Sequence, residues 1–75
     1  MKIIVTESIA LEGIEHLKSK GFDVDVKFGI SREDLLEIIG NYDALIVRSV
    51  TKVNEELMEK APNLKVVGRA GNGVD

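Results

Sequence analysis

Four short apolar runs, separated by three longer amphipathic segments, constrain the fold of this chain most. Residues 3–5 and 44–47 are continuous apolar runs, residues 64–67 are apolar except for Lys65, and residues 22–28 alternate apolar and charged side chains. Both patterns are typical of β-strands. Strands that alternate with helices predict a parallel sheet with right-handed crossovers. The sequence therefore predicts a βαβαβαβ arrangement in one small α/β domain.

Each predicted helix has a capping residue before it and a breaking residue after it. The predicted N-caps are Ser8, Ser31 and Asn54, and the predicted ends fall at Gly21, Gly40 and Pro62. Apolar residues at helical spacing are expected to face the sheet. They are Ala10, Leu11, Ile14 and Leu17 in the first helix, Leu35, Leu36, Ile38 and Ile39 in the second, and Leu57, Met58 and Ala61 in the third.

The apolar patterns also predict the order of the strands. In the second run, Asp23 and Asp25 alternate with apolar residues, which indicates an edge strand whose aspartates face solvent. The third run, 44–47, is wholly apolar and is expected to be central. The predicted order is 2-1-3-4, the beginning of a flavodoxin-like sheet. Ligands bind such sheets beyond the carboxyl ends of the strands, here between strands one and three.

Two neighbouring strands of this predicted sheet each end near an arginine. Arg48 follows the third strand directly, and Arg69 stands in a glycine-rich stretch, residues 68–73, after the fourth. Neighbouring strands lie about 4.8 Å apart, so both guanidinium groups could converge on one phosphate or carboxylate. For either arginine alone, a surface ion pair with a carboxylate such as Glu7 is the commoner arrangement. The pair together predicts an anion site.

Composition excludes several other functions. The 75 residues carry a net charge of −3 with both signs mixed, which disfavours a nucleic-acid partner. The absence of cysteine excludes disulfides and thiolate metal sites. The first apolar run is too short for a signal peptide, and nothing approaches a membrane span, so a cytoplasmic location is expected. His16 is expected on the solvent side of the first helix, without a catalytic or metal-binding role.

Two segments resemble a known family. LIVRSVTKV (residues 45–53) and VVGRAGNGVD (residues 66–75) resemble the amino-terminal part of the D-3-phosphoglycerate dehydrogenases, a branch of the NAD-dependent D-2-hydroxyacid dehydrogenases. The resemblance implies that residues 1–75 form a single, partial substrate-binding domain of flavodoxin-like fold. The Rossmann NAD domain is then absent from this chain. Relatives that act on smaller acids often lack the arginine matching Arg69, which favours the phosphoglycerate branch.

The resemblance also implies residue roles. The implied substrate-binding residues are Arg48, Ser49, Arg69, Ala70, Gly71 and Asn72. Asn72 would also lie near the cofactor NAD, where the family usually has threonine. The catalytic histidine, its carboxylate partner and the GxGxxG segment would all come later in the parent protein, so no catalytic residue is expected in this chain. The parent would oxidise 3-phosphoglycerate in serine biosynthesis, and the 75 residues alone would be inactive.

Other interpretations remain open at this point. The chain could belong to a glyoxylate or hydroxypyruvate reductase of the same family. It could also be a non-enzymatic flavodoxin-like binding module such as a receiver domain, although Arg48 and Ser49 replace the acidic residue that a receiver needs after strand three. One face of the sheet is expected to be poorly covered near the fourth strand, whose edge is open. Both features predict a homo-oligomer, as a dimer or by an exchanged element.

Overall fold

A computed structural model of the chain describes residues 1–9, 11–48 and 51–69. In these ranges strands and helices alternate as the sequence predicts. The strands are β1 (Lys2–Val5), β2 (Asp23–Val26), β3 (Ala44–Val47) and β4 (Val66–Arg69). The helices are α1 (Leu11–Ser19), α2 (Arg32–Ile38) and α3 (Glu55–Glu59), and a 3-10 turn, η1 (Ile39–Asn41), continues α2.

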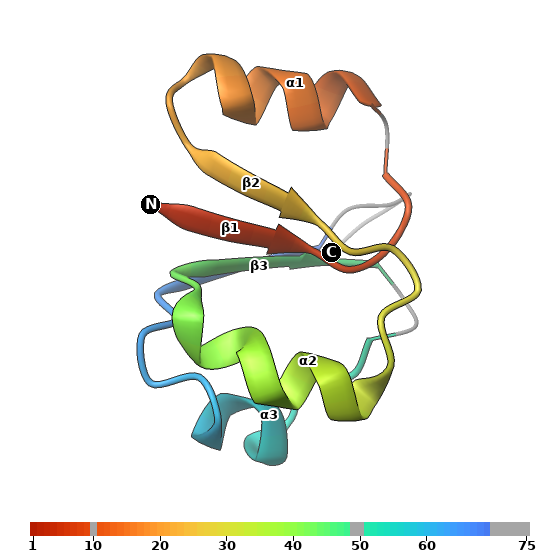
Figure 1. Cartoon of the computed structure of the whole chain (residues 1–75), viewed down its shortest axis with the longest axis vertical. Coiled ribbons are helices and arrows are strands. Elements are labelled where there is room, and N and C mark those ends of the chain that lie inside the picture. The colour runs from red at the N-terminus through yellow and green to blue at the C-terminus, as the bar shows by residue number, and fades with distance from the viewer. Residues whose placement is uncertain (10, 49–50, 70–75) are drawn as a thin grey trace.

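The strands form one parallel sheet in the order β2-β1-β3-β4, which confirms the predicted topology. Helix α1 lies on one side of the sheet, and α2 and α3 lie on the other (Figure 1). This arrangement follows from right-handed crossovers on either side of β1. All four strands therefore point their carboxyl ends toward the same edge of the sheet.

Alternating side chains of the inner strands fill two separate cores. Ile4, Leu45 and Val47 face α2 and α3, and they belong to the larger core. The other members of that core are Leu35, Ile39, Tyr42, Leu57 and Ala61. The smaller core beside α1 consists of Ile3, Val5 and Ala44, with partly buried residues such as Leu17 and Phe22 packed against it. Residues 3–5 of β1 and the whole of β3 are apolar, and their burial between both layers fixes β1 and β3 as the central strands.

Two of the three predicted helix caps are confirmed. The Ser31 side chain accepts a hydrogen bond from the Asp34 amide, and the Asn54 side chain accepts one from the Leu57 amide. The prediction for Ser8 is wrong, because α1 begins only at Leu11 and Ser8 lies too far ahead of it. The backbone carbonyl of Ser8 instead accepts a hydrogen bond from Arg48.

Two residues predicted to face the sheet are instead exposed. Met58 is 44% exposed, because it lies a hundred degrees around α3 from the fully buried Leu57. Leu11 is 67% exposed at the first residue of α1, whereas Ile14, one turn later, is buried. Residue 10 lies outside the described residues. The α2 prediction holds, with Leu35 and Ile39 buried and Leu36 and Ile38 partly buried; in α3, Leu57 and Ala61 are buried as predicted.

The fourth strand starts two residues later than predicted. Leu64 belongs to a turn that its amide closes on the Ala61 carbonyl, and its side chain packs against the larger core. Gly68 and Arg69, predicted to begin a loop, are therefore strand residues that pair with Ile46 and Val47. The rest of the predicted glycine loop lies outside the described residues.

The prediction that both aspartates of β2 face solvent is half wrong. Asp23 is exposed, but Asp25 is half-buried and accepts a 2.6 Å hydrogen bond from the Tyr42 hydroxyl. The strand is at the edge of the sheet, as predicted. His16 is exposed on α1. No helix within the described ranges is long and apolar enough to cross a membrane.

Candidate functional site

A pocket of about 450 Å³ opens at the carboxyl ends of β1, β2 and β3. It is lined by Thr6, Glu7, Ser8, Phe28, Gly29, Ile30, Arg48 and Thr51. These residues follow the ends of three strands, so the parallel sheet itself gathers them. The position between β1 and β3 is where the strand order reverses, which is the ligand position that the sequence predicts.

Arg48 is the cationic residue of this pocket. It follows β3 directly, its side chain is exposed, and its Nη1 donates a 3.1 Å hydrogen bond to the Ser8 carbonyl. A guanidinium group has five N–H donors in a planar fork, and this contact uses one. The segment after β1 therefore orients the group while other donors stay available to an anion.

Two further contacts join the segments that follow β1 and β3. The hydroxyl groups of Thr6 and Thr51 lie 3.0 Å apart in a hydrogen bond, and Thr6 is only 2% exposed. The Thr51 amide donates a 2.7 Å hydrogen bond to Oε2 of Glu7. A buried hydroxyl needs a hydrogen-bond partner, and here the partner belongs to the opposite segment. The floor of the pocket is thus a polar junction between the two strand ends.

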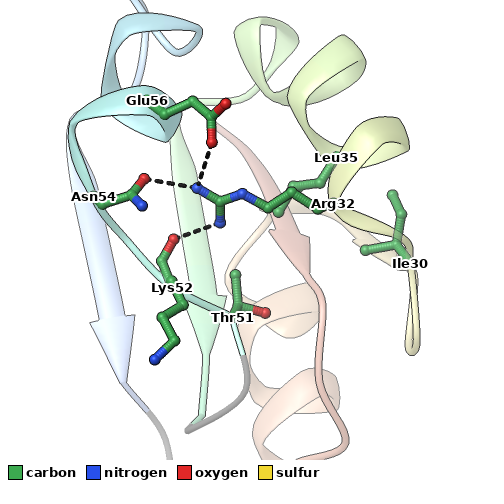
Figure 2. Close-up of a pocket in the computed structure, with 7 residues that line it drawn as sticks. All are labelled: Ile30, Arg32, Leu35, Thr51, Lys52, Asn54 and Glu56. Carbon is green, nitrogen blue, oxygen red and sulfur yellow. Dashed lines mark hydrogen bonds and ion pairs between the residues drawn. The ribbon is translucent and has the colours of Figure 1, made fainter.

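A second arginine, Arg32, which no sequence pattern marks, holds residues 52–54 from the α2 side. Arg32 projects from the start of α2 across a smaller pocket of about 250 Å³ (Figure 2). Its Nη1 donates to the Lys52 carbonyl at 2.7 Å, and its Nη2 donates to Asn54 Oδ1 at 2.6 Å. Nη2 also forms an ion pair with Glu56 at 3.3 Å. Because protein acceptors already occupy this guanidinium, Arg32 is a structural link rather than a ligand-binding group.

Arg69 lies at the same end of the sheet as Arg48, but one residue earlier relative to β3. It pairs with Val47, the residue before Arg48. Val47 faces the core beneath α2 and α3, and paired residues of parallel strands point to the same face. The register therefore assigns Arg69 to the α2 and α3 face, whereas Arg48 reaches toward Ser8. The sheet brings the two strand ends together, and the convergence of both side chains on one anion stays a prediction.

The remaining predicted site residues, Ser49, Ala70, Gly71 and Asn72, lie outside the described residues. Within the described ranges, no group of three or more histidine, aspartate or glutamate side chains could hold a metal ion. The single histidine of the sequence, His16, is exposed on α1 and does not line this pocket. The pocket lining thus offers a guanidinium, three hydroxyls and one carboxylate. These groups can bind an anion, but they include no histidine for proton transfer.

Comparison with known proteins defines the class. The model of the D-isomer specific 2-hydroxyacid dehydrogenase catalytic domain matches residues 3–75. The chain belongs to this family, which confirms the resemblance that its two motif segments carry. Membership also agrees with the α/β fold and the strand order 2-1-3-4.

The relatives within the family are more specific. The chain is 48% identical over 75 residues to the D-3-phosphoglycerate dehydrogenase of Archaeoglobus fulgidus, and 48% identical over 75 residues to that of Methanocaldococcus jannaschii. Both alignments include the whole chain and only 14% of the relative. The chain therefore spans about a seventh of the length of these enzymes.

Solved structures agree with this assignment. The NAD⁺-bound 3-phosphoglycerate dehydrogenase of Entamoeba histolytica superposes with a TM-score of 0.81 at 33% identity, over 100% of this chain and 27% of that one. A protein from Pyrococcus horikoshii superposes with a TM-score of 0.86 at 36% identity, over 99% of this chain and 22% of that one. The chain is thus homologous to D-3-phosphoglycerate dehydrogenases in both sequence and fold.

Proposed function

We propose that this chain is the substrate-binding part of an NAD-dependent D-3-phosphoglycerate dehydrogenase. The parent enzyme would oxidise 3-phosphoglycerate to 3-phosphohydroxypyruvate in serine biosynthesis. The observation that carries the proposal is the position of Arg48, in a pocket at the reversal point of a sheet that is homologous to these enzymes. Both relatives named above are D-3-phosphoglycerate dehydrogenases, which supports 3-phosphoglycerate as the substrate.

The chemistry of the pocket suits this substrate. 3-Phosphoglycerate carries a phosphate and a carboxylate, and planar guanidinium groups bind both through paired hydrogen bonds. Arg48 is held by the Ser8 carbonyl in the pocket wall, with further donors available. We propose Ser49, Ala70, Gly71 and Asn72 as other substrate contacts, with Asn72 also near the cofactor. We propose Arg69 as a further contact, whose long side chain would reach the anion around the end of β4 from the α2 and α3 face.

The described residues do not fit NAD itself. A dinucleotide site needs a glycine-rich turn between a strand and the start of a helix, where backbone N–H groups meet the pyrophosphate. Residues 6–8, which follow β1, contain no glycine, and the segment between β2 and α2 contains only Gly29. Hydride transfer also needs a proton-transfer group held against the substrate. We therefore propose that the NAD domain and the catalytic residues belong to other parts of the parent, and that this chain alone is inactive.

Titration of the isotope-labelled chain with 3-phosphoglycerate, followed by NMR, tests the proposal. The amide shifts should centre on residues 6–8, Arg48 and Thr51. Arg48→Ala should raise the Kd about tenfold or more, because charge-assisted hydrogen bonds contribute about 1.5–3 kcal/mol. Arg48→Lys should recover only part of the affinity, since an ammonium group lacks the planar fork.

A matched control is Lys18→Ala, which removes one positive charge from the exposed side of α1 and should leave the Kd unchanged. Shifts scattered over the surface, or equal affinities for Arg48→Ala and the original chain, would refute the site. Equal affinities for hydroxypyruvate and 3-phosphoglycerate would instead favour a reductase of unphosphorylated acids.

A further inference from the structure

We propose that Glu7 is a positioning residue, whose carboxylate fixes the segment after β3 so that Arg48 meets the anion in the right orientation. The inference deepens the proposed function and rests on it. It explains why the acidic side chain of Glu7 lines a pocket that is otherwise suited to a negatively charged ligand.

Three consecutive residues after β1 each hold the segment after β3 by a different chemical group. The Thr6 hydroxyl contacts the Thr51 hydroxyl at 3.0 Å, and the Glu7 carboxylate accepts the Thr51 amide at 2.7 Å. The Ser8 carbonyl accepts Nη1 of Arg48 at 3.1 Å. Arg48 and Thr51, the two residues held, are three apart in the sequence. Residues 6–8 therefore hold both Arg48 and Thr51 in place.

Of the three groups that residues 6–8 contribute to these contacts, the Glu7 carboxylate is the one that carries a negative charge. A carboxylate close to a bound anion raises the free energy of the complex by Coulomb repulsion. A carboxylate is also the stronger acceptor for a backbone N–H, since charge-assisted hydrogen bonds are shorter and stronger than neutral ones. If positioning outweighs repulsion, Glu7 improves binding in spite of its charge.

The segment is held from the opposite side as well. Arg32 donates to the Lys52 carbonyl and to Asn54 (Figure 2). Together with the contacts of Thr51 to Thr6 and Glu7, these hydrogen bonds fix residues 51–54 both to α2 and to the end of β1. Release of the Thr51 amide from Glu7 leaves the side nearer to Arg48 with one fewer hydrogen bond. We expect this loss to reach Arg48, because only residues 49 and 50 separate it from Thr51.

Positioning by Glu7 and repulsion by its charge predict opposite changes in the Kd for 3-phosphoglycerate when Glu7 is replaced. Glu7→Ala removes both the charge and the acceptor, whereas Glu7→Gln removes the charge and keeps a carbonyl acceptor. If positioning dominates, Glu7→Ala should raise the Kd for 3-phosphoglycerate about fivefold or more, because the loss of the Thr51 hydrogen bond alone corresponds to about that factor. Glu7→Gln should bind as tightly as the original chain or more tightly. Glu15→Ala, which removes an exposed carboxylate from α1, should leave the Kd within about twofold.

Hydrogen exchange of the Thr51 amide gives a second readout that does not depend on the ligand. It should become faster in Glu7→Ala and stay slow in Glu7→Gln. Equal or tighter binding by Glu7→Ala would overturn the inference, because the charge would then be the larger effect. Unchanged exchange at Thr51 in Glu7→Ala would overturn it too.

The proposed function and the inference can fail separately. If the original chain binds neither 3-phosphoglycerate nor inorganic phosphate, the proposed function fails, and exchange at Thr51 still decides whether Glu7 holds the segment. If Glu7→Ala does not fold, Thr6→Val and Thr6→Ser replace it, since valine fits the volume of the buried threonine without its hydroxyl. Thr6→Val should then weaken binding severalfold, and Thr6→Ser should restore it. Equal affinities of these two variants would contradict the proposal that residues 6–8 position Arg48.

Discussion

Tyr42 illustrates, for a single residue, how a polar group is accommodated in the larger core. Its ring is buried, with 4% exposure, and its hydroxyl donates to Asp25 at 2.6 Å. Nζ of Lys2 lies 5.2 Å from the ring centroid, within range of a cation–π contact. Burial, the hydrogen bond to Asp25 and the negative charges of Asp25 and Asp23 together raise the pKa of Tyr42 to about 12. The Tyr42 hydroxyl of the folded chain therefore stays protonated at pH values above 10.0, the ordinary pKa of tyrosine.

We expect Tyr42→Phe to lower the free energy of unfolding by about 1–2 kcal/mol at pH 7, because Asp25 loses a hydrogen bond in a half-buried position. The raised pKa adds a dependence on pH. Below pH 10.0, the ordinary Tyr value, the stabilisation is complete; as the pH rises from there to about 12, the unfolded chain loses its proton first and the stabilisation is lost. Urea titrations of both chains across this interval measure the effect.

The comparison with Tyr42→Phe separates this titration from that of the lysines, which both chains share. The two stabilities should differ at pH 7 and converge near pH 12. Asp25→Asn, which keeps an acceptor for the hydroxyl, should cost less than Tyr42→Phe at pH 7. Identical stabilities of the original chain and Tyr42→Phe at pH 7 would show that the hydrogen bond contributes nothing.

Among the elements, the short helix α3 depends on the residue that caps it, Asn54. The helix has only five residues, too few to be stable without its cap and its packing. Asn54 Oδ1 accepts from the Leu57 amide at 3.2 Å and from Arg32 at 2.6 Å. Asn54→Ala should therefore lower the free energy of unfolding by about 1–2 kcal/mol, as measured by urea unfolding. Asn54→Asp keeps both acceptor contacts and should unfold close to the original midpoint, and an unchanged midpoint for Asn54→Ala would contradict the role of the cap.

The same elements show what the sequence can predict. The caps at Ser31 and Asn54 act within three residues, so local pattern is sufficient to find them. The start of β4 is missed because Leu64 is apolar both in a strand and in a turn that packs against the core. The Tyr42–Asp25 hydrogen bond is missed for a different reason: it joins residues 17 apart, and only the paired sheet brings them together.

The candidate site is predictable to a similar extent. The edge of the sheet and Arg48 follow from a topological rule that needs only the strand order. The contact that orients Arg48 does not follow, since Arg48 and Ser8 are 40 residues apart. Nor do the contacts that hold the residues after it, since Thr6 and Thr51 are 45 apart and Arg32 and Lys52 are 20 apart. No local pattern marks Arg32, which is an ordinary helix-forming residue at the start of α2. The predicted convergence of Arg48 and Arg69 depends on register, because one residue of offset places neighbouring side chains on opposite faces.

For the molecule as a whole, the two edges of the sheet differ in how they are protected. The β2 edge includes the charged Asp23 and Asp25, which disfavour pairing with another strand. The β4 edge presents Val66 and Val67, which are 51% and 41% exposed. Helix α1 packs beside β2, at the other edge of the sheet from β4 (Figure 1). Among the described residues, no strand pairs with the outer edge of β4. A strand that begins with two exposed valines at such an edge is suited to pair with a second copy of itself across a two-fold axis.

We therefore expect the chain to self-associate through β4, with a dissociation constant that sedimentation equilibrium can measure. Val66→Lys should weaken the association about tenfold or more, because a lysine on an edge strand would bring its charge into the interface. Val26→Lys is the matched control: it places the same charge at a similarly exposed valine of β2, 39% exposed, and should leave the constant unchanged. Equal weakening by both variants would indicate a general effect of charge, and a monomer at every concentration would show that the β4 edge does not pair.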